Sequence, residues 1–245
     1  MVGGAELPPL HGLPFGVKDL NDTEGLVTTY GSPLYRDNVP EKDELLVAKL
    51  RQAGGIVLGK TATPEFGAGG NTTVNEVHGY TRNAFDPSRA CGGSSGGSGV
   101  ALACGMMPLC TGSDSGGSLR KPATFSGVSA IRPTTGLVPS DKRGVGFTNF
   151  SVQGPMARTA DDCALMLSVM AGDDVEDPLS FNVRREDYRL LPEVDLSTLR
   201  VAISVDFGWA PVEHGIRDTF EARLKRFQSV FKSCERFDLS LIHIS

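Results

Sequence analysis

Residues 92–98 read GGSSGGS and residues 112–123 read GSDSGGSLRKPA, and these two serine–glycine stretches decide how the chain is interpreted. Between them, residues 95–105 predict a helix that tolerates its glycines for close packing, and residues 107–112 predict a buried strand. A single helix–strand excursion can return the chain to the same edge of a sheet. The sequence therefore predicts that the two stretches form polar loops lying side by side.

Upstream of these loops, the pattern predicts a strand, a helix and a second strand. Residues 13–18 (LPFGVK) form an apolar run that ends in a lysine. Residues 41–55 carry apolar residues at helical spacing, with Gly54 placed as a C-terminal cap. Residues 56–59 (IVLG) predict a short buried strand, and residues 63–87 have mostly turn and loop chemistry.

Downstream, the pattern continues with a short helix beginning near Ser118 and a strand at residues 128–133. Residues 159–172 predict a well-marked helix, because Thr159 can cap its start and Gly172 follows its end. Strands that alternate with helices imply an α/β fold.

The chain is expected to divide into a core at residues 1–172 and an incomplete second part at residues 173–245. The second part begins with a polar, proline-bearing surface excursion. A strand at residues 199–207 and an amphipathic helix at residues 212–231 follow. The final residues, 240–245 (SLIHIS), fit either a further strand or a non-native tail.

Composition excludes several classes of protein. The 245 residues carry a net charge of −5, which argues against a nucleic-acid-binding surface, and no stretch approaches the ~20 apolar residues of a membrane helix. The five cysteines are odd in number and form no CxxC pair, which disfavours a disulfide framework or a structural zinc site. No secretory signal precedes residue 13, so a reducing cytoplasm is the expected location.

Two short motifs have competing interpretations. Residues 54–61 (GGIVLGKT) match the phosphate-loop pattern and leave a nucleotide-binding module as an alternative, but Ile56, Val57 and Leu58 have strand character where a loop is required. Residues 92–96 match the G-x-S-x-G pattern of α/β-hydrolases, which needs a preceding strand and a later histidine. A turn-rich segment precedes this match, and the histidines are only His11, His78, His214 and His243. Taken alone, the serine–glycine run would also suit a flexible linker.

A wider constellation is more specific than either motif. GVKD at residues 16–19 joins the stretches at residues 92–98 and 112–123, and together they closely resemble the amidase-signature family. The resemblance runs from residue 7 to residue 172 and continues more weakly through residues 199–208 and the helix expected at residues 212–231. It implies a mixed β-sheet core flanked by helices.

The resemblance also implies a catalytic relay. Ser118 would be the nucleophile, Ser94 a bridging serine on a cis peptide bond, and Lys18 the base. A lysine can act as a base only when it is neutral, and burial at the end of an apolar strand would lower its pKa. Asp19 should face the opposite side of the strand.

Backbone amides near the nucleophile would supply the oxyanion hole, because the glycines let successive amides turn toward one point. The residues expected there are Ser115, Gly116 and Gly117, together with the amide of Ser118. Supporting roles are expected for Ser113, which could hydrogen-bond the nucleophile, and for Asp114 and Arg120, which would form a structural ion pair. Ser95 is expected to help hold the loop.

The chain also departs from the family pattern. Cys91 stands where the family commonly has proline, and it is expected to be a packed residue beside the active loop. Family members are usually much longer at both ends. The chain is therefore expected to be a fragment that lacks an N-terminal segment and the C-terminal half, and a catalytically dead fragment stays an alternative.

The expected activity is hydrolysis of a small aliphatic or aryl amide to a carboxylate and ammonia or an amine, with no cofactor and no metal. Esters and urethanes are chemically close substrates. The alternative within the family is the glutaminase subunit of a tRNA-dependent amidotransferase. The expected partner is a small amide rather than nucleic acid or a membrane, and a homodimer is left open.

Overall fold

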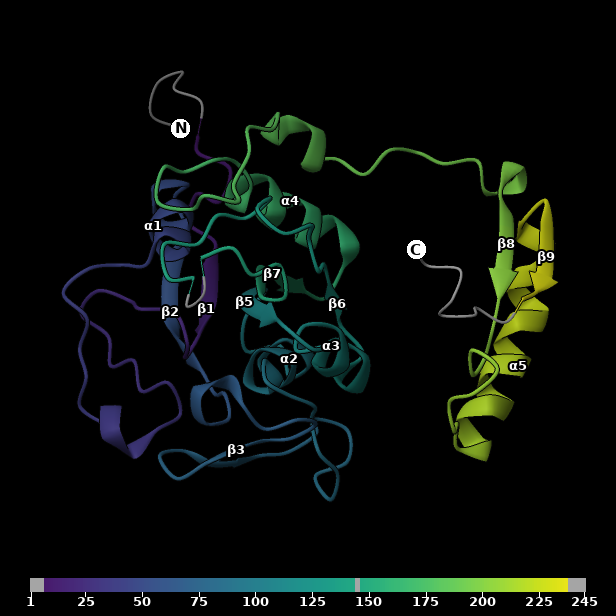
Figure 1. Ribbon diagram of the computed structural model, residues 1–245, viewed down its shortest axis with the longest axis horizontal. Helices are drawn as coiled ribbons and strands as arrows, with labels where there is room; N and C mark the ends of the chain where they lie inside the picture. The colour runs from purple at the N-terminus through teal and green to yellow at the C-terminus, as the bar shows by residue number, and fades with distance from the viewer. Residues whose placement is uncertain (1–6, 144–145, 238–245) are drawn as a thin grey trace. The chain divides into compact units, whose positions relative to one another are not determined.

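The computed structural model describes residues 7–143 and 146–237, and the chain divides into two compact units, Met1–Leu191 and Pro192–Ser245 (Figure 1). The helices are α1 (Leu45–Gln52), α2 (Gly96–Ala103), α3 (Arg120–Ser126), α4 (Ala160–Met170) and α5 (His214–Phe227). The strands are β1 (Pro14–Lys18), β2 (Ile56–Thr61), β3 (Thr73–Asn75), β4 (Gly79–Thr81), β5 (Leu109–Asp114), β6 (Ser129–Ala130), β7 (Val152–Ala157), β8 (Arg200–Ile203) and β9 (Ser233–Arg236).

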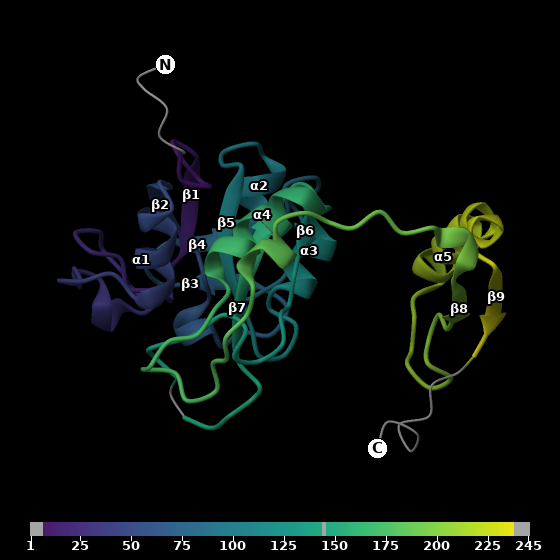
Figure 2. The same ribbon diagram turned by 90° about the horizontal axis from the view of Figure 1, so that it is seen from above.

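The first unit is built on a five-stranded mixed sheet with the strand order β2-β1-β5-β7-β6 (Figures 1 and 2). Strand β1 runs parallel to both β2 and β5, whereas β7 runs antiparallel to β5 and β6. The predicted α/β fold with a mixed sheet is confirmed. Because β1, β2 and β5 are parallel, their carboxyl ends meet at one edge of the sheet, and the loops that leave this edge form the candidate site.

Helices cover both faces of this sheet, and the alternation of side chains along each strand decides which face a residue joins. Leu109 packs into a core with residues of α1 and α4, and its neighbour Cys110 packs into a second core with residues of α2 and α3. In β1, Phe15 and Val17 belong to the first core. Lys18 therefore points to the opposite face, where α2 lies.

The predicted helix signals act as expected. Helix α1 ends in a Schellman motif, since Gly54 has a positive φ of 87° and its amide donates to the Arg51 carbonyl, while the Gly55 amide donates to the Leu50 carbonyl. Helix α4 is capped by Thr159, whose hydroxyl accepts from the Asp162 amide at 3.1 Å. These local signals fix where the two helices that cover the first core begin and end.

The sequence analysis did not predict strand β7. It also overestimated the length of the neighbouring strand β6, which spans Ser129–Ala130 instead of residues 128–133. Strand β7 contains Gly154 and Pro155, which are residues typical of turns. Gly154 is required because a Cβ there would collide with the Ile131 carbonyl. Pro155 has no N–H to donate, but its carbonyl accepts from the Ile131 amide at 3.2 Å. Residues 63–87 were also expected to be irregular, but they contain the β3–β4 hairpin.

The second unit contains β8 and β9, which pair in parallel, and α5 between them. The predicted strand at residues 199–207 is shorter than expected, and the predicted helix at residues 212–231 ends earlier and continues as a 3-10 turn. The expected boundary after residue 172 lies further along the chain, because Val183 and Tyr188 pack against the first core. The prediction for residues 240–245 and His243 falls outside the described residues.

Candidate active site

Lys18 ends strand β1 at the carboxyl edge of the sheet. Its backbone amide donates to the Thr111 hydroxyl of β5 at 2.8 Å, and its side chain is fully buried. Thr111 in turn donates to Asn21 Oδ1 at 3.4 Å. Sequence reasoning missed both polar partners, because a threonine within a predicted buried strand is ordinary and gives no signal of a site.

Three serine hydroxyls surround the Lys18 amine. Nζ lies 2.8 Å from Ser94 Oγ, 2.9 Å from Ser95 Oγ and 2.9 Å from Ser113 Oγ. Ser94 and Ser95 come from the loop before α2, and Ser113 comes from β5. The structure thus brings two of the predicted residues onto the lysine, and it adds Ser95, for which only a loop-holding role was expected.

These hydroxyls differ in what they can offer the amine. Ser95 Oγ donates to the Ser113 carbonyl at 3.3 Å, so its proton is used and it can only accept from Lys18. Ser94 and Ser113 donate to no other group among the described residues. A neutral amine has two N–H donors and one lone pair. It can therefore donate to Ser95 and Ser113 while it accepts a proton from Ser94.

The electrostatic surroundings favour this neutral form. Burial lowers the pKa of Lys18 to about 7, against the opposing attraction of the Asp114 carboxylate. The Asp19 carboxylate is used elsewhere, since it accepts from the Thr29 amide at 3.1 Å and lies 3.8 Å from Lys60 Nζ. Lys18 is therefore poised to exchange a proton near neutral pH.

The loop that carries Ser94 needs its glycines. The Gly93–Ser94 peptide bond is cis, as the resemblance implies for the bridging serine, and Gly92 has a positive φ of 81°. A Cβ on Gly93 would lie 2.6 Å from the Thr72 carbonyl oxygen. The loop is thus held close to neighbouring backbone, and helix α2 begins directly after it. Strand β4 ends at Thr81 and no strand of the described chain leads directly into Ser94, so the nucleophile-elbow interpretation does not fit.

Ser118 lies on the second loop, half-buried, just before helix α3. The Ser95 amide donates to the Ser118 carbonyl at 3.3 Å, which joins the two loops. In the described part of the chain, no hydrogen bond links the hydroxyls of Ser94 and Ser118. The structure therefore places the predicted nucleophile beside the lysine cluster without connecting it to the cluster through its side chain.

Asp114 organises this second loop. Its carboxylate is fully buried and accepts from the Gly117 amide at 2.7 Å, the Leu119 amide at 3.1 Å and Arg120 Nε at 3.0 Å. Burial alone would raise the pKa of Asp114, but the hydrogen bonds from Arg120 and the backbone amides together hold it well below its usual range. The expected ion pair between Asp114 and Arg120 is present.

One expected oxyanion donor is engaged in this way. The Gly117 amide donates to the Asp114 carboxylate, so it is not free for a substrate oxygen. Aspartate side chains often accept from nearby backbone amides in this way. Ser115 and Gly116 are exposed. Within the described ranges, the amides of Ser115, Gly116 and Ser118 donate to no other group of the chain.

Residues 54–61 form no phosphate loop. Strand β2 runs through the variable positions of that motif, and Lys60 points into the protein. Its amine donates to the Asn21 carbonyl, and to the hydroxyls of Thr23 and Thr28 at 2.9 Å each. These contacts occupy the lysine that a phosphate would need.

The histidines and cysteines take no part in the described cluster. His78 Nε2 lies 3.8 Å from Asp19, His11 is exposed, and His214 begins α5 in the second unit. All five cysteines are free, and Cys91 is fully buried, as expected for a packed residue. Among the described residues, no helix is long and apolar enough to cross a membrane, and no group of three or more His, Cys, Asp and Glu side chains could hold a metal ion.

Known proteins are similar to this chain over most of its length. The sequence model of the family described as Amidase matches residues 2–239. An acylamidase of Rhodococcus erythropolis is 43% identical over 210 residues, which make up 86% of this chain and 44% of that protein. The A subunit of a glutamyl-tRNA(Gln) amidotransferase of Chromohalobacter salexigens is 37% identical over 227 residues, or 92% of this chain and 46% of that protein.

The fold agrees with these matches. A bacterial aryl acylamidase of the amidase signature enzymes superposes with a TM-score of 0.86 at 29% identity, covering 96% of this chain and 49% of its own. The chain thus spans about half the length of the relatives it matches. On both its sequence and its fold, the chain belongs to the amidase family, the amidase-signature enzymes.

Proposed function

We propose that the protein hydrolyses the carboxamide bond of a small amide through an acyl-enzyme on Ser118. The observation that carries the proposal is the fully buried Lys18 amine, which contacts three serine hydroxyls. Two of them, Ser94 and Ser95, belong to the loop whose Ser95 amide donates to the Ser118 carbonyl. Such an amine is a base only when it is neutral, and its pKa of about 7 supplies the neutral form at physiological pH.

The proposed reaction begins when Ser118 Oγ attacks the carbonyl carbon of the substrate. Ser94 takes the proton from Ser118 and passes its own proton to the lone pair of Lys18, which the other hydroxyls leave directed at Ser94. Reversal of the relay protonates the leaving nitrogen as the C–N bond breaks. A water molecule then hydrolyses the ester on Ser118, with the same relay as general base. This route requires the Ser118 hydroxyl to turn toward Ser94 when substrate binds.

The negative charge on the tetrahedral intermediate needs donors. We propose the amides of Ser115, Gly116 and Ser118 for this role, because they donate to nothing else within the described residues. Asp114 would stabilise the loop by accepting from Gly117 and from Arg120. Loss of one oxyanion donor typically costs ~3–4 kcal/mol of transition-state stabilisation.

A cavity of about 200 Å³ opens beside the lysine cluster and supports a small substrate. Ser113 lines it together with Leu20, Val138 and Gln153. Leu20 and Val138 would contact the apolar part of a compact amide. The rest of the lining is mostly polar and includes the charged side chains of Glu44, Lys142 and Arg143.

The test is hydrolysis of a simple anilide and labelling by a serine-directed fluorophosphonate. Both should be abolished by Ser118→Ala, and the variant should unfold at the same denaturant concentration as the wild type. Retained hydrolysis in Ser118→Ala, or loss of hydrolysis on replacing a histidine instead, would refute the relay. A cytoplasmic location and a homodimer stay predictions.

A second candidate is hydrolysis of glutamine for a tRNA-dependent amidotransferase, since several relatives, 33–38% identical to this chain, are named as the A subunits of glutamyl-tRNA(Gln) amidotransferases. It uses the same relay, so substrate preference separates the two. Turnover of glutamine but not of the anilide, with genes for partner subunits beside this one, would favour the second candidate.

A further inference from the structure

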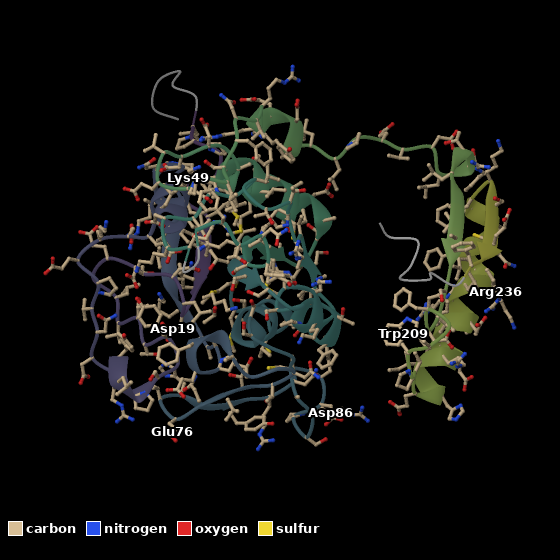
Figure 3. All side chains as sticks on the ribbon, in the orientation of Figure 1. Asp19, Lys49, Glu76, Asp86, Trp209 and Arg236 are labelled. Atoms are coloured by element: carbon tan, nitrogen blue, oxygen red, sulfur yellow. The ribbon has the colours of Figure 1, made fainter. Side chains whose placement is uncertain are left out.

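A cavity of about 360 Å³ lies at the opposite end of β1 from the lysine cluster. Its floor comes from Lys49 and Ala53 at the end of α1 and from Ser168 and Val169 of α4. The chain before β1 closes it with Pro8 and Pro9. Figure 3 shows Lys49 near this end of the sheet, and Asp19, which follows Lys18, near the other end.

The floor of this cavity holds a buried cation without a partner. Lys49 Nζ is completely buried and has no hydrogen-bond partner among the described residues. Burial and the nearby Arg185 lower the pKa of Lys49, and Asp174 and Asp173 oppose them without forming a hydrogen bond to the amine. A buried ammonium without an acceptor is costly. Because Nζ has no accessible surface in the cavity, the Lys49 side chain would turn toward a bound anion, and this contact would remove the cost.

The rim of the cavity adds more positive charge. Arg185 and Arg189 lie four residues apart on η3 (Arg185–Tyr188) and its C-terminal cap, and neither forms an ion pair within the described residues. A Cβ on Gly172 would lie 2.9 Å from Arg185 Nη2, so the guanidinium packs against the end of α4. Glu186 is the acidic residue of the lining. The cavity is therefore cationic in a protein whose net charge is −5.

We propose that this cavity binds a small organic carboxylate, whose anionic group contacts Lys49 and the two arginines. The apolar lining from Pro8, Pro9 and Val169 selects an anion with an apolar body, and the volume exceeds the need of an inorganic anion. The proposal concerns a second site and does not depend on the activity at Ser118.

The experiment titrates the full chain with benzoate and follows binding by calorimetry, with benzyl alcohol as the neutral analogue and inorganic phosphate as the anion without an apolar body. Benzoate should bind at least tenfold more tightly than either. Lys49→Met should weaken benzoate binding at least tenfold. Because no hydrogen bond to Lys49 Nζ is lost, this variant should fold normally. Arg185→Gln should weaken binding less.

Two control variants separate this site from others. Arg184 carries the same charge as Arg185 but pairs with Asp187 and does not line the cavity. The Arg184→Gln variant should therefore bind benzoate like the wild type. Lys18→Met should also bind like the wild type, which separates this cavity from the candidate active site. Hydrogen exchange should slow in residues 49–53 and 185–189 on binding. Equal affinity of Lys49→Met and the wild type, or equal affinity for benzyl alcohol, would overturn the proposal, and equal affinity for phosphate would overturn the apolar selectivity.

Discussion

Lys18 and Lys60 lie at the ends of two neighbouring parallel strands, but on opposite faces of the sheet. Val17 is in register with Lys60, and Lys18 is in register with Thr61. Lys60 therefore lies on the same face of the sheet as Val17, and Lys18 lies on the opposite face with Thr61. Lys18 faces α2 and its serines. Lys60 faces the turn that follows β1, where Asp19, Thr23 and Thr28 lie.

The two environments differ in the protons they can supply. All three partners of Lys60 can only accept from it, because Asn21 offers a carbonyl and the hydroxyls of Thr23 and Thr28 already donate to backbone carbonyls. Three acceptors require the three N–H groups of an ammonium. Around Lys18, in contrast, the hydroxyls of Ser94 and Ser113 keep their protons available. Burial lowers the pKa of Lys60 to about 8, against the attraction of Asp19, so it stays mostly charged at pH 7.

This contrast teaches that burial alone does not make a lysine a base. Both amines are desolvated, but only Lys18 has partners that remain satisfied when it loses a proton. The hydrogen bonds thus support a structural role for Lys60 and the proposed proton-transfer role for Lys18.

The largest expected effect comes from removing the amine of Lys18. Lys18→Met should lower kcat/KM for the anilide by roughly 10³-fold or more, because the relay loses its proton acceptor. Its free energy of unfolding should change less than that of Lys60→Met, since serine hydroxyls can find other partners. The measurement is a steady-state assay beside a urea unfolding curve. A variant that keeps a tenth of the wild-type activity would contradict the assignment.

The converse variant is expected to affect stability instead. Lys60→Met should lower the free energy of unfolding by ~3 kcal/mol, because it removes the cation that lies 3.8 Å from the buried Asp19 carboxylate and takes one donor from the Asn21 carbonyl. Activity per folded molecule should stay within about threefold of the wild type. Urea unfolding with an active-site titration separates the two quantities. Full stability with lost activity would reverse the comparison.

The pH profile tests the protonation state of Lys18 directly. Because the base must be neutral, kcat/KM should rise with pH through a midpoint near 7 and fall about tenfold per pH unit below it. The same lowered pKa makes burial of Lys18 unfavourable at low pH and relieves this cost as pH rises from about 7 toward the unfolded value of 10.5. A midpoint near 10 would mean that Lys18 is not desolvated as the structure indicates.

The smallest expected effect concerns the partner that orients the amine. Ser113→Ala removes an acceptor from neutral Lys18 and should lower kcat about tenfold, because the lone pair is then less firmly directed at Ser94. KM should stay nearly constant. Ser113→Thr, which keeps the hydroxyl, should recover most of the rate. Equal rates for the alanine variant and the wild type would mean that Ser95 alone orients the amine.

The sequence by itself determined the family, the α/β fold, the strand that ends in Lys18 and the loops that carry Ser94 and Ser118. These features could be predicted because each depends on local signals: apolar runs, helix caps, and glycines that permit close approach. The glycines beside Ser94 are such a signal, since the cis bond and the positive φ both occur there.

Only the tertiary structure decided how the hydrogen bonds are distributed. The contacts of Lys18 with Ser94, Ser95 and Ser113 join residues 76 to 95 positions apart, and which hydroxyls meet the amine depends on which strand ends and loops lie together. The antiparallel strand β7 could not be predicted for the same reason, whereas the hydrogen bond from the Gly117 amide to Asp114 is a local contact that the sequence analysis did not predict. A sequence pattern names the donors and acceptors, but the number of partners that each one finds is set by packing across the sheet.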